Sequence, residues 1–328
     1  MKLLRFIAPG DRAADAARLG LQRGDRIADL GQLARDLHDE RRHWFEDMPG
    51  FIRGGAEAQA HVARHGQALF ETGAGVYAMG EVRLLAPFMP TTILCAGSNY
   101  HAHNREKAAA PLSGKEPEFF IKTSDCVIGP GDAIVHDRVL TRKLDCETEL
   151  AVVIGKPGRH IPVASALEHV FGYSIVNDVT ARDRQVRLKP DGSAWYELGR
   201  GKVFDTSAPF GPCVVTADEV GDPQALRLRT RINGELRQSS STRDMIWSCA
   251  ELIHFFSINM TLKPGMVIIT GTPAGTAWSS DAELGGRWTP PPAGDDDEAL
   301  VPAKGYNQVG DLVECDIERI GVLRNSVA

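Results

Sequence analysis

Three carboxylates alternate along one stretch of the chain and could share one face of a β-strand. They are Asp145, Glu147 and Glu149, in the segment LDCETELAVVIGK, where an apolar run follows them. Residues two apart in a strand point to the same side, so these acids would lie close together. Their mutual repulsion favours a counter-charge, for which a hard divalent cation with oxygen ligands is suited. The alternative is a solvated edge strand, whose acids pair with lysines such as Lys143 and Lys156.

A second group of polar side chains, NDVTARDRQ at 177–185, directly follows the apolar run GYSIV. A loop that leaves a rigid strand is a common place for an active site. Asp178 could therefore complete a set of three carboxylates with Glu147 and Glu149. In the other interpretation, Asp178 or Thr180 caps the start of a helix, and the two interpretations are compatible.

His103 and Glu106 belong to a third polar cluster, which follows the apolar run TTILCA. Residues three apart lie side by side on a helical turn. A carboxylate that is hydrogen-bonded to an imidazole orients it and raises its basicity, which makes a pair able to activate water. Such pairs are also common on helix surfaces, so the spacing alone does not distinguish a catalytic pair from a surface contact.

Two more clusters are GKVFDT at 201–206 and TGTPAGT at 270–276. The second lacks the spacing and the lysine of a phosphate-binding P-loop, which disfavours nucleotide binding. Its hydroxyls and backbone amides suit an anion such as a carboxylate.

The overall composition is typical of an ordinary globular protein. The chain has 328 residues, of which 43% are hydrophobic and 24% charged, and its formal net charge is -6. Basic residues form no patch with interleaved aromatics, which disfavours nucleic acid as a partner. The six cysteines lie far apart in the sequence and form no compact framework, which fits reduced thiols in a cytosolic protein. No apolar run resembles a secretory signal or a membrane span of about 20 residues, so we expect a cytoplasmic protein without membrane association.

The elements that must position these clusters indicate two regions with a boundary in the proline-containing stretch near residue 88. We expect residues 1–88 to form a small α/β domain. Its strands are expected near 2–7 and 26–30, and its helices over 33–44 and 56–70.

Residues 89–328 are expected to form a larger, strand-rich domain. Many short strands separated by Gly or Pro turns favour a β-rich α+β architecture over a doubly wound sheet. Strands are expected at 93–96, 118–123, 126–128, 144–154, 173–177, 211–215, 226–232, 266–270 and 312–317, and helices at 165–169 and 243–258.

One segment, 277–304, contains the tract TPPPAGDDDEALVP and is interpreted as an acidic, proline-rich insertion. Its composition cannot form a packed element, which favours a solvent-exposed loop. The alternative is a loop that covers the site or contacts a partner subunit.

In this order the clusters resemble the fumarylacetoacetate hydrolase (FAH) family. The resemblance consists of NYxxH, ExE, NDxTxRDxQ, GKxFDT, DMI followed by a helix, and TGTPxG. It extends from residue 92 to about 276 and resumes at 310–325. Each motif is weak alone, but their ordered combination is highly specific. In this sequence Thr276 stands where the family often has valine after TGTPxG, and the tract that follows is longer than expected.

The resemblance implies a role for each matching residue. It implies that Glu147, Glu149 and Asp178 bind one Mg²⁺ or Mn²⁺ ion, with Asp145 as a neighbouring acid. The catalytic residues implied are His103 and Glu106, the water-activating pair, together with Lys202. The residues implied for substrate binding are Arg182, Gln185, Thr272 and Lys122. Trp195 and Tyr196 could line the pocket or pack in the core.

The activity implied is hydrolysis of a C–C bond in a 2,4-dioxo acid, such as an acylpyruvate or a fumarylpyruvate-like compound. A 2-oxo acid or a 1,3-diketone can chelate a divalent ion, which stabilises the enolate that forms. With the same metal site, an isomerase or tautomerase, or a decarboxylase of 2-oxo acids, is the alternative. A non-catalytic binding module is a third hypothesis, against which the complete ligand set argues. The resemblance also implies an FAH-like catalytic domain of rolled, mixed β-sheets and a homodimer.

Overall fold

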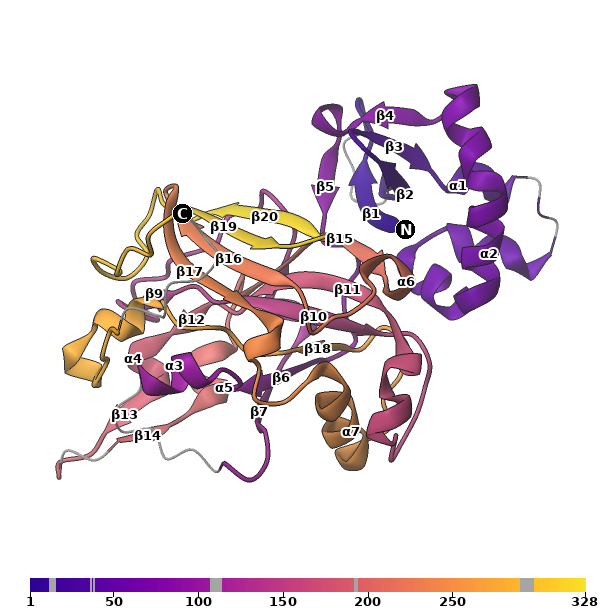
Figure 1. Ribbon diagram of the computed structural model, residues 1–328. Helices are drawn as coiled ribbons and strands as arrows, with labels where there is room; N and C mark the ends of the chain where they lie inside the picture. The colour runs from indigo at the N-terminus through magenta and orange to yellow at the C-terminus, as the bar shows by residue number, and fades with distance from the viewer. Residues whose placement is uncertain (12–15, 36, 38, 107–113, 192–193, 290–297) are drawn as a thin grey trace.

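A long mixed β-sheet runs through the molecule (Figure 1). The computed structural model describes residues 1–11, 16–35, 37, 39–106, 114–191, 194–289 and 298–328. Within these residues the sheet has twelve strands in the order β4-β3-β2-β1-β15-β11-β10-β18-β6-β7, with β5 paired to β1 and β8 to β15. The strands are β1 (Lys2–Ile7), β2 (Arg18–Arg23), β3 (Arg26–Asp29), β4 (Val76–Ala78), β5 (Arg83–Leu85), β6 (Ile93–Gly97), β7 (Glu118–Lys122), β8 (Val127–Ile128), β10 (Thr148–Ile154), β11 (Val170–Asn177), β15 (Ala208–Thr216) and β18 (Val267–Ile269).

The middle of this sheet is antiparallel from β15 through β11 and β10 to β18, and β18 then pairs in parallel with β6. Every residue of β10 is buried. A strand that is covered on both faces reads as a continuous apolar run, as Leu150 to Ile154 does. The sheet therefore forms the core of the molecule.

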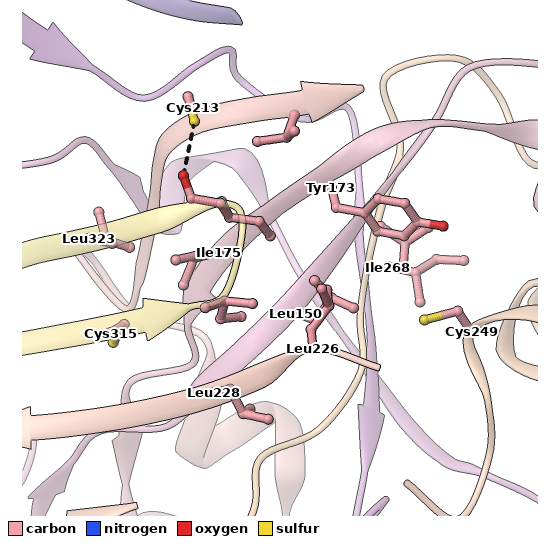
Figure 2. Packing of buried hydrophobic residues seen from close by; sticks show 14 of the residues in the cluster. Leu150, Tyr173, Ile175, Cys213, Leu226, Leu228, Cys249, Ile268, Cys315 and Leu323 are labelled. Carbon is pink, nitrogen blue, oxygen red and sulfur yellow. Dashed lines mark hydrogen bonds between the residues drawn. The ribbon is translucent and has the colours of Figure 1, made fainter. Parts of the chain in front are cut away.

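A second sheet of four strands, in the order β17-β16-β19-β20, packs against the first. Figure 2 shows Leu150 of β10 and Ile175 of β11 beside Leu228, Cys315 and Leu323 of this second sheet. Its strands are β16 (Arg227–Ile232), β17 (Glu235–Ser241), β19 (Leu312–Ile317) and β20 (Gly321–Ser326). Two short pairs complete the strands: β9 (Leu144–Asp145) with β12 (Thr180–Ala181), and β13 (Val186–Leu188) with β14 (Ala194–Tyr196).

The helices are short apart from α2 and α7. The α-helices are α1 (Gly31–Ala34), α2 (Met48–Thr72), α3 (His101–Arg105), α4 (Arg182–Gln185), α5 (Leu198–Lys202), α6 (Ala217–Val220) and α7 (Cys249–Asn259). The 3-10 helices are η2 (Glu40–Phe45), η3 (Met79–Glu81), η4 (Ser124–Cys126), η5 (Val163–His169), η6 (Thr242–Asp244), η7 (Ala277–Ser280) and η8 (Ala282–Leu284). This arrangement confirms the predicted β-rich α+β fold.

The first 88 residues are joined to the large sheet through β1. This strand pairs with β2 on one side and with β15 on the other, where Leu3 lies opposite Val214. Helix α2 packs on the same region, with Phe51 in an edge-on contact with Phe171 of β11 at 6.0 Å between ring centroids. In Figure 1 these strands and α2 lie at the upper right, away from α3, α4 and α5. The division into two domains at residue 88 stays a prediction.

Several predicted elements differ from those observed. Helix α2 begins at Met48, before the predicted 56–70, because Asp47 caps it by accepting from the Gly50 amide at 2.6 Å. Gly55 interrupts it with φ at 51°, a conformation that glycine adopts readily. The predicted helix 33–44 is instead α1 and η2, and of 243–258 the α-helical part begins at Cys249. There Ser248 and Glu251 form a capping box.

The described residues include no helix that is long and apolar enough to cross a membrane. All six cysteines are unpaired and buried, as predicted for small core residues.

Candidate metal and active site

Three buried carboxylates meet where β10 begins and β11 ends. Glu147 and Glu149 flank the first residue of β10, and Asp178 directly follows β11. The antiparallel register sets Thr148 opposite Asn177, and the Asp178 amide donates to the Glu147 carbonyl at 2.8 Å. One oxygen from each carboxylate lies within 4.8 Å of the others. The fold thus gathers the three predicted ligands into one cluster.

The predicted single strand 144–154 is broken between β9 and β10, and this break separates Asp145 from the cluster. The Cys146 amide donates to the Asp145 carboxylate, and the Glu147 amide donates to Asn177 Oδ1, both at 2.9 Å. Asp145 instead accepts from Arg182 Nε at 2.8 Å. It is a neighbouring acid that holds Arg182.

Three buried cations surround the carboxylate cluster. Lys202 Nζ lies 2.5 Å from both Glu147 Oε2 and Asp178 Oδ2. Arg182 donates from Nη2 to Glu147 Oε1. Burial would raise the pKa of Glu147, but the charges of Arg182 and Lys202 outweigh it and hold this pKa well below its usual range. Burial would likewise lower the pKa of Lys202, but Asp178 and Glu147 raise it, so Lys202 is a cation.

Glu149 is in the opposite situation. Burial raises its pKa well above the usual range, and the charges of Asp178 and Glu147 raise it further. Its Oε2 accepts from the Gly271 amide at 2.7 Å, which does not offset those effects. The charged form of Glu149 therefore needs another cation close to the cluster.

The residues present fit a divalent cation with oxygen ligands. Asp178 Oδ1 is buried and accepts no hydrogen bond, although Lys122 Nζ lies 3.0 Å away as an ion pair. If every acid here is ionised, five carboxylates face three cations, so two negative charges remain, which is the charge of one such ion. The buried acids are Glu106, Asp145, Glu147, Glu149 and Asp178, and the buried cations are Lys122, Arg182 and Lys202.

The predicted pair of His103 and Glu106 forms at the end of α3. His103 Nδ1 lies 3.2 Å from Glu106 Oε2, and both side chains are buried. Glu106 Oε1 accepts from the Gly275 amide at 2.8 Å, so the pair is attached to the loop after β18. A carboxylate at Nδ1 leaves Nε2 as the basic nitrogen of the imidazole.

Of the residues predicted to bind substrate, Arg182 and Gln185 are neighbours on α4. Arg182 Nη1 donates to Gln185 Oε1 at 2.8 Å, which directs the amide nitrogen of Gln185 away from Arg182. Thr272 Oγ1 donates to the Thr148 carbonyl at 3.1 Å and accepts from Gln238 Nε2 at 2.9 Å. Its hydroxyl therefore fixes the loop after β18 to β10.

Lys122 differs from the other predicted substrate-binding residues because it lies behind Asp178. It is fully buried, and its Nζ donates to the Ser207 carbonyl at 2.9 Å and also to the Lys202 carbonyl. This position favours holding Asp178 and Lys202 in place over contact with a substrate.

A cavity of about 20 Å³ lies at the carboxylate cluster. That is room for about one water-sized group, so any larger ligand requires its walls to move. A larger hollow of about 350 Å³, which Arg237 and Tyr306 help to line, touches none of the three clustered carboxylates. Among the residues lining the small cavity are Ser98, His103, Glu147, Glu149, Asp178, Arg182, Gln185, Lys202 and Thr272, but not Lys122, Glu106, Trp195 or Tyr196.

The sequence prediction missed Trp278, the second residue of the predicted insertion. The prediction of solvent exposure is wrong for Ala277, Trp278 and Ser279, which are buried. The Trp278 ring covers the Arg182 guanidinium, with Arg182 Cζ 5.2 Å from the ring centroid. The available sequence signal for this residue was a tryptophan shortly after TGTPAGT. The acidic, proline-rich composition of the rest of the segment concealed it. Residues 290–297 of the predicted insertion lie outside the described residues.

Comparison with known proteins identifies the relatives of this chain. The family profile described as fumarylacetoacetate (FAA) hydrolase C-terminal matches residues 92–328. The oxaloacetate tautomerase YisK of Bacillus subtilis is 37% identical, over 92% of this chain and 93% of its own length. The human mitochondrial oxaloacetate tautomerase FAHD2A is 38% identical, over 85% of this chain and 79% of its own length.

Solved structures agree on the fold. A fumarylacetoacetate hydrolase from Exiguobacterium antarcticum has a TM-score of 0.74 at 34% identity, covering 100% of this chain and 99% of that chain. A maleylpyruvate hydrolase from Sphingobium, solved with manganese(II) and pyruvate, has a TM-score of 0.72 at 27% identity over the same shares.

Proposed function

Since the chain belongs to the fumarylacetoacetate hydrolase family, we propose that it is a metal-dependent tautomerase that interconverts the keto and enol forms of a 2-oxo dicarboxylate such as oxaloacetate. The relatives named as oxaloacetate tautomerases support this alternative over the hydrolase that the sequence resemblance implies. The observation that carries the proposal is the buried carboxylate cluster, which shares one cavity with Lys202 and His103.

Glu147, Glu149 and Asp178 would hold the divalent ion, Mg²⁺ or Mn²⁺. When bound, such an ion supplies Lewis-acid polarisation of the 2-oxo group. The protein's own cation, Lys202, lies within 2.5 Å of two of these carboxylates and donates a hydrogen bond to the substrate oxygen that gains negative charge.

His103 is proposed to move the proton. With Glu106 at Nδ1, its Nε2 takes a proton from the carbon next to the 2-oxo group, and the C–H electron pair forms the new C=C bond. The same nitrogen then returns the proton to the oxygen, which completes the enol and needs no further reactant. The amide nitrogen of Gln185 and the cation Arg182 orient the substrate's carboxylates.

The direct test is the rate at which enol oxaloacetate becomes the keto form, followed by loss of the enol's ultraviolet absorption. The protein is assayed with Mg²⁺, with Mn²⁺ and after chelation. We expect acceleration only with metal. Release of pyruvate from oxaloacetate measures decarboxylation, and cleavage of an acylpyruvate measures hydrolysis. Cleavage without any tautomerase activity would overturn the proposal in favour of the hydrolase.

Hydrolysis remains a second candidate because the His103–Glu106 pair can also activate water, and one structural neighbour is a maleylpyruvate hydrolase. We expect His103→Gln to lower the tautomerase kcat by about 10²- to 10⁴-fold, the usual contribution of general acid–base catalysis. Metal content, measured by elemental analysis, should not change.

His101→Gln is the matched control, since His101 lies on the same helix and is exposed. It should leave the rate unchanged. If His103→Gln abolishes acylpyruvate cleavage but spares tautomerisation, His103 activates water and another group moves the tautomerase proton.

We also propose a homodimer, as the family resemblance implies. The edge strand β7 of the large sheet exposes Phe119 and Ile121 at 44% and 40%, and apolar side chains on an open edge favour pairing with another copy. Sedimentation velocity should show the dimer mass, and a monomer at assay concentration would contradict the proposal.

A cytoplasmic location stays a prediction, because the relatives include a bacterial protein and others named as mitochondrial.

A further inference from the structure

Trp278 lies against two residues of the proposed mechanism. Its side chain is buried, and its ring covers the Arg182 guanidinium at 5.2 Å. It also meets His103 and Tyr196 edge-on, at 6.5 and 5.6 Å between ring centroids. It is not among the residues that line the small cavity, but it contacts Arg182 and His103, which are.

One carboxylate holds both Trp278 and Arg182. Asp145 accepts from the Ala277 amide at 3.0 Å, from the Trp278 amide at 3.1 Å and from Arg182 Nε at 2.8 Å. The indole nitrogen of Trp278 donates to the Leu284 carbonyl at 3.1 Å, which fixes the ring. The positions of the indole and the guanidinium are therefore coupled.

A second attachment joins the Trp278 segment to Lys143, which directly precedes β9 and is bonded to Arg182. Asp281 accepts from Lys143 Nζ at 2.7 Å and from the Tyr306 hydroxyl at 2.6 Å. The Lys143 carbonyl in turn accepts from the Arg182 amide at 2.9 Å. The segment 277–284 is thus attached to the β9–β12 pair at two points.

Arg182 uses its nitrogens on Asp145, Glu147 and Gln185, all of which lie around the edge of the planar guanidinium. Bonds in the plane of the group restrain it least against displacement perpendicular to that plane. An aromatic ring over its face opposes that displacement, and a buried cation–π contact is stronger than an exposed one. A tilt of Arg182 would move both Glu147 and Gln185.

We propose that Trp278 is a positioning residue, which holds the Arg182 guanidinium and the His103 imidazole in the geometry that binds and converts the substrate. This inference rests on the proposed function. It assigns the first part of the insertion, 277–284, to the active site.

The test compares Trp278→Ala with Trp278→Phe in the metal-loaded protein. We expect Trp278→Ala to lower the tautomerase kcat/KM by about 10²-fold, the cost of a small misplacement of reacting groups. It should also weaken binding of oxalate, a small dicarboxylate, by about tenfold or more in calorimetry. Trp278→Phe keeps an aromatic face and should restore both values to within about threefold.

Trp195→Ala is the matched control, because Trp195 is 36% exposed and covers Arg187 outside the cavity. It should change neither value. Asp281→Asn loosens the segment without removing the indole and should give an intermediate loss, so the inference stays testable if Trp278→Ala does not fold.

Unchanged kcat/KM and oxalate affinity in Trp278→Ala would overturn the inference. So would equal loss in the alanine and phenylalanine variants, because an aromatic face would then not matter. If the wild-type protein lacks tautomerase activity, the proposed function fails, while the oxalate affinities still decide the role of Trp278.

Discussion

Replacing Glu149 by glutamine is expected to remove the bound metal and to lower the tautomerase kcat/KM by about a thousandfold or more. Charge stabilisation at the reacting oxygen commonly contributes that much. Glu149 is the sharpest choice of the three carboxylates because burial, Asp178 and Glu147 raise its pKa, so its charged form depends on an added cation. Without metal, glutamine resembles the protonated side chain in shape and charge.

The effect of Glu149→Gln on the fold and its effect on metal binding can be measured separately. The melting temperature of the metal-free protein should change little in Glu149→Gln. In the wild-type protein, Mn²⁺ at a hundred times its Kd should add about 2.7 kcal/mol of stability, and the variant should lose this gain. Glu168→Gln, at an exposed glutamate, is the control and should behave as wild type. If Glu149→Gln keeps stoichiometric metal and full activity, the assignment of the metal site is wrong.

Replacing Lys202 by methionine should lower kcat by about 10²- to 10³-fold and leave the metal bound. Methionine keeps an unbranched side chain in the buried position but cannot donate to an oxygen that gains charge. The carboxylates remain, and the cation that competes with the metal for Glu147 and Asp178 is gone. Metal affinity should therefore be retained or increased, as measured by calorimetry.

Lys263→Met tests the same substitution at an exposed lysine and should have no effect. Loss of metal together with activity in Lys202→Met would mean that Lys202 organises the metal-binding carboxylates. Its assigned role in charge stabilisation would then be wrong.

The sequence allowed the carboxylate cluster to be predicted because local patterns determine it. Glu147 and Glu149 are two residues apart beside an apolar run, and Asp178 ends the strand that pairs with theirs. The partners of Asp145 could not be predicted in the same way. Ala277 and Trp278 lie more than 130 residues further along the chain, and no periodicity connects them with Asp145.

For the fold, apolar runs predicted the central strands, while polar strands were missed. Strand β17, ELRQSSS, has no apolar run and is held by pairing with β16. The extension of the large sheet into the first 88 residues was also missed, because a strand's sequence does not reveal which edge it joins. Trp278 was hidden for a different reason, since a tract of proline and acids after it dominated the composition of its segment.

The pairing of β1 with β15 has a consequence for any shortened form of this chain. A chain starting at residue 89 would leave β15 without its neighbour along Val214 and Val215, and Phe171 without the cover of Phe51. Open hydrogen-bonding groups beside bare apolar side chains promote aggregation. The part of the chain without assigned chemistry thus covers surface that the part carrying the site would otherwise expose.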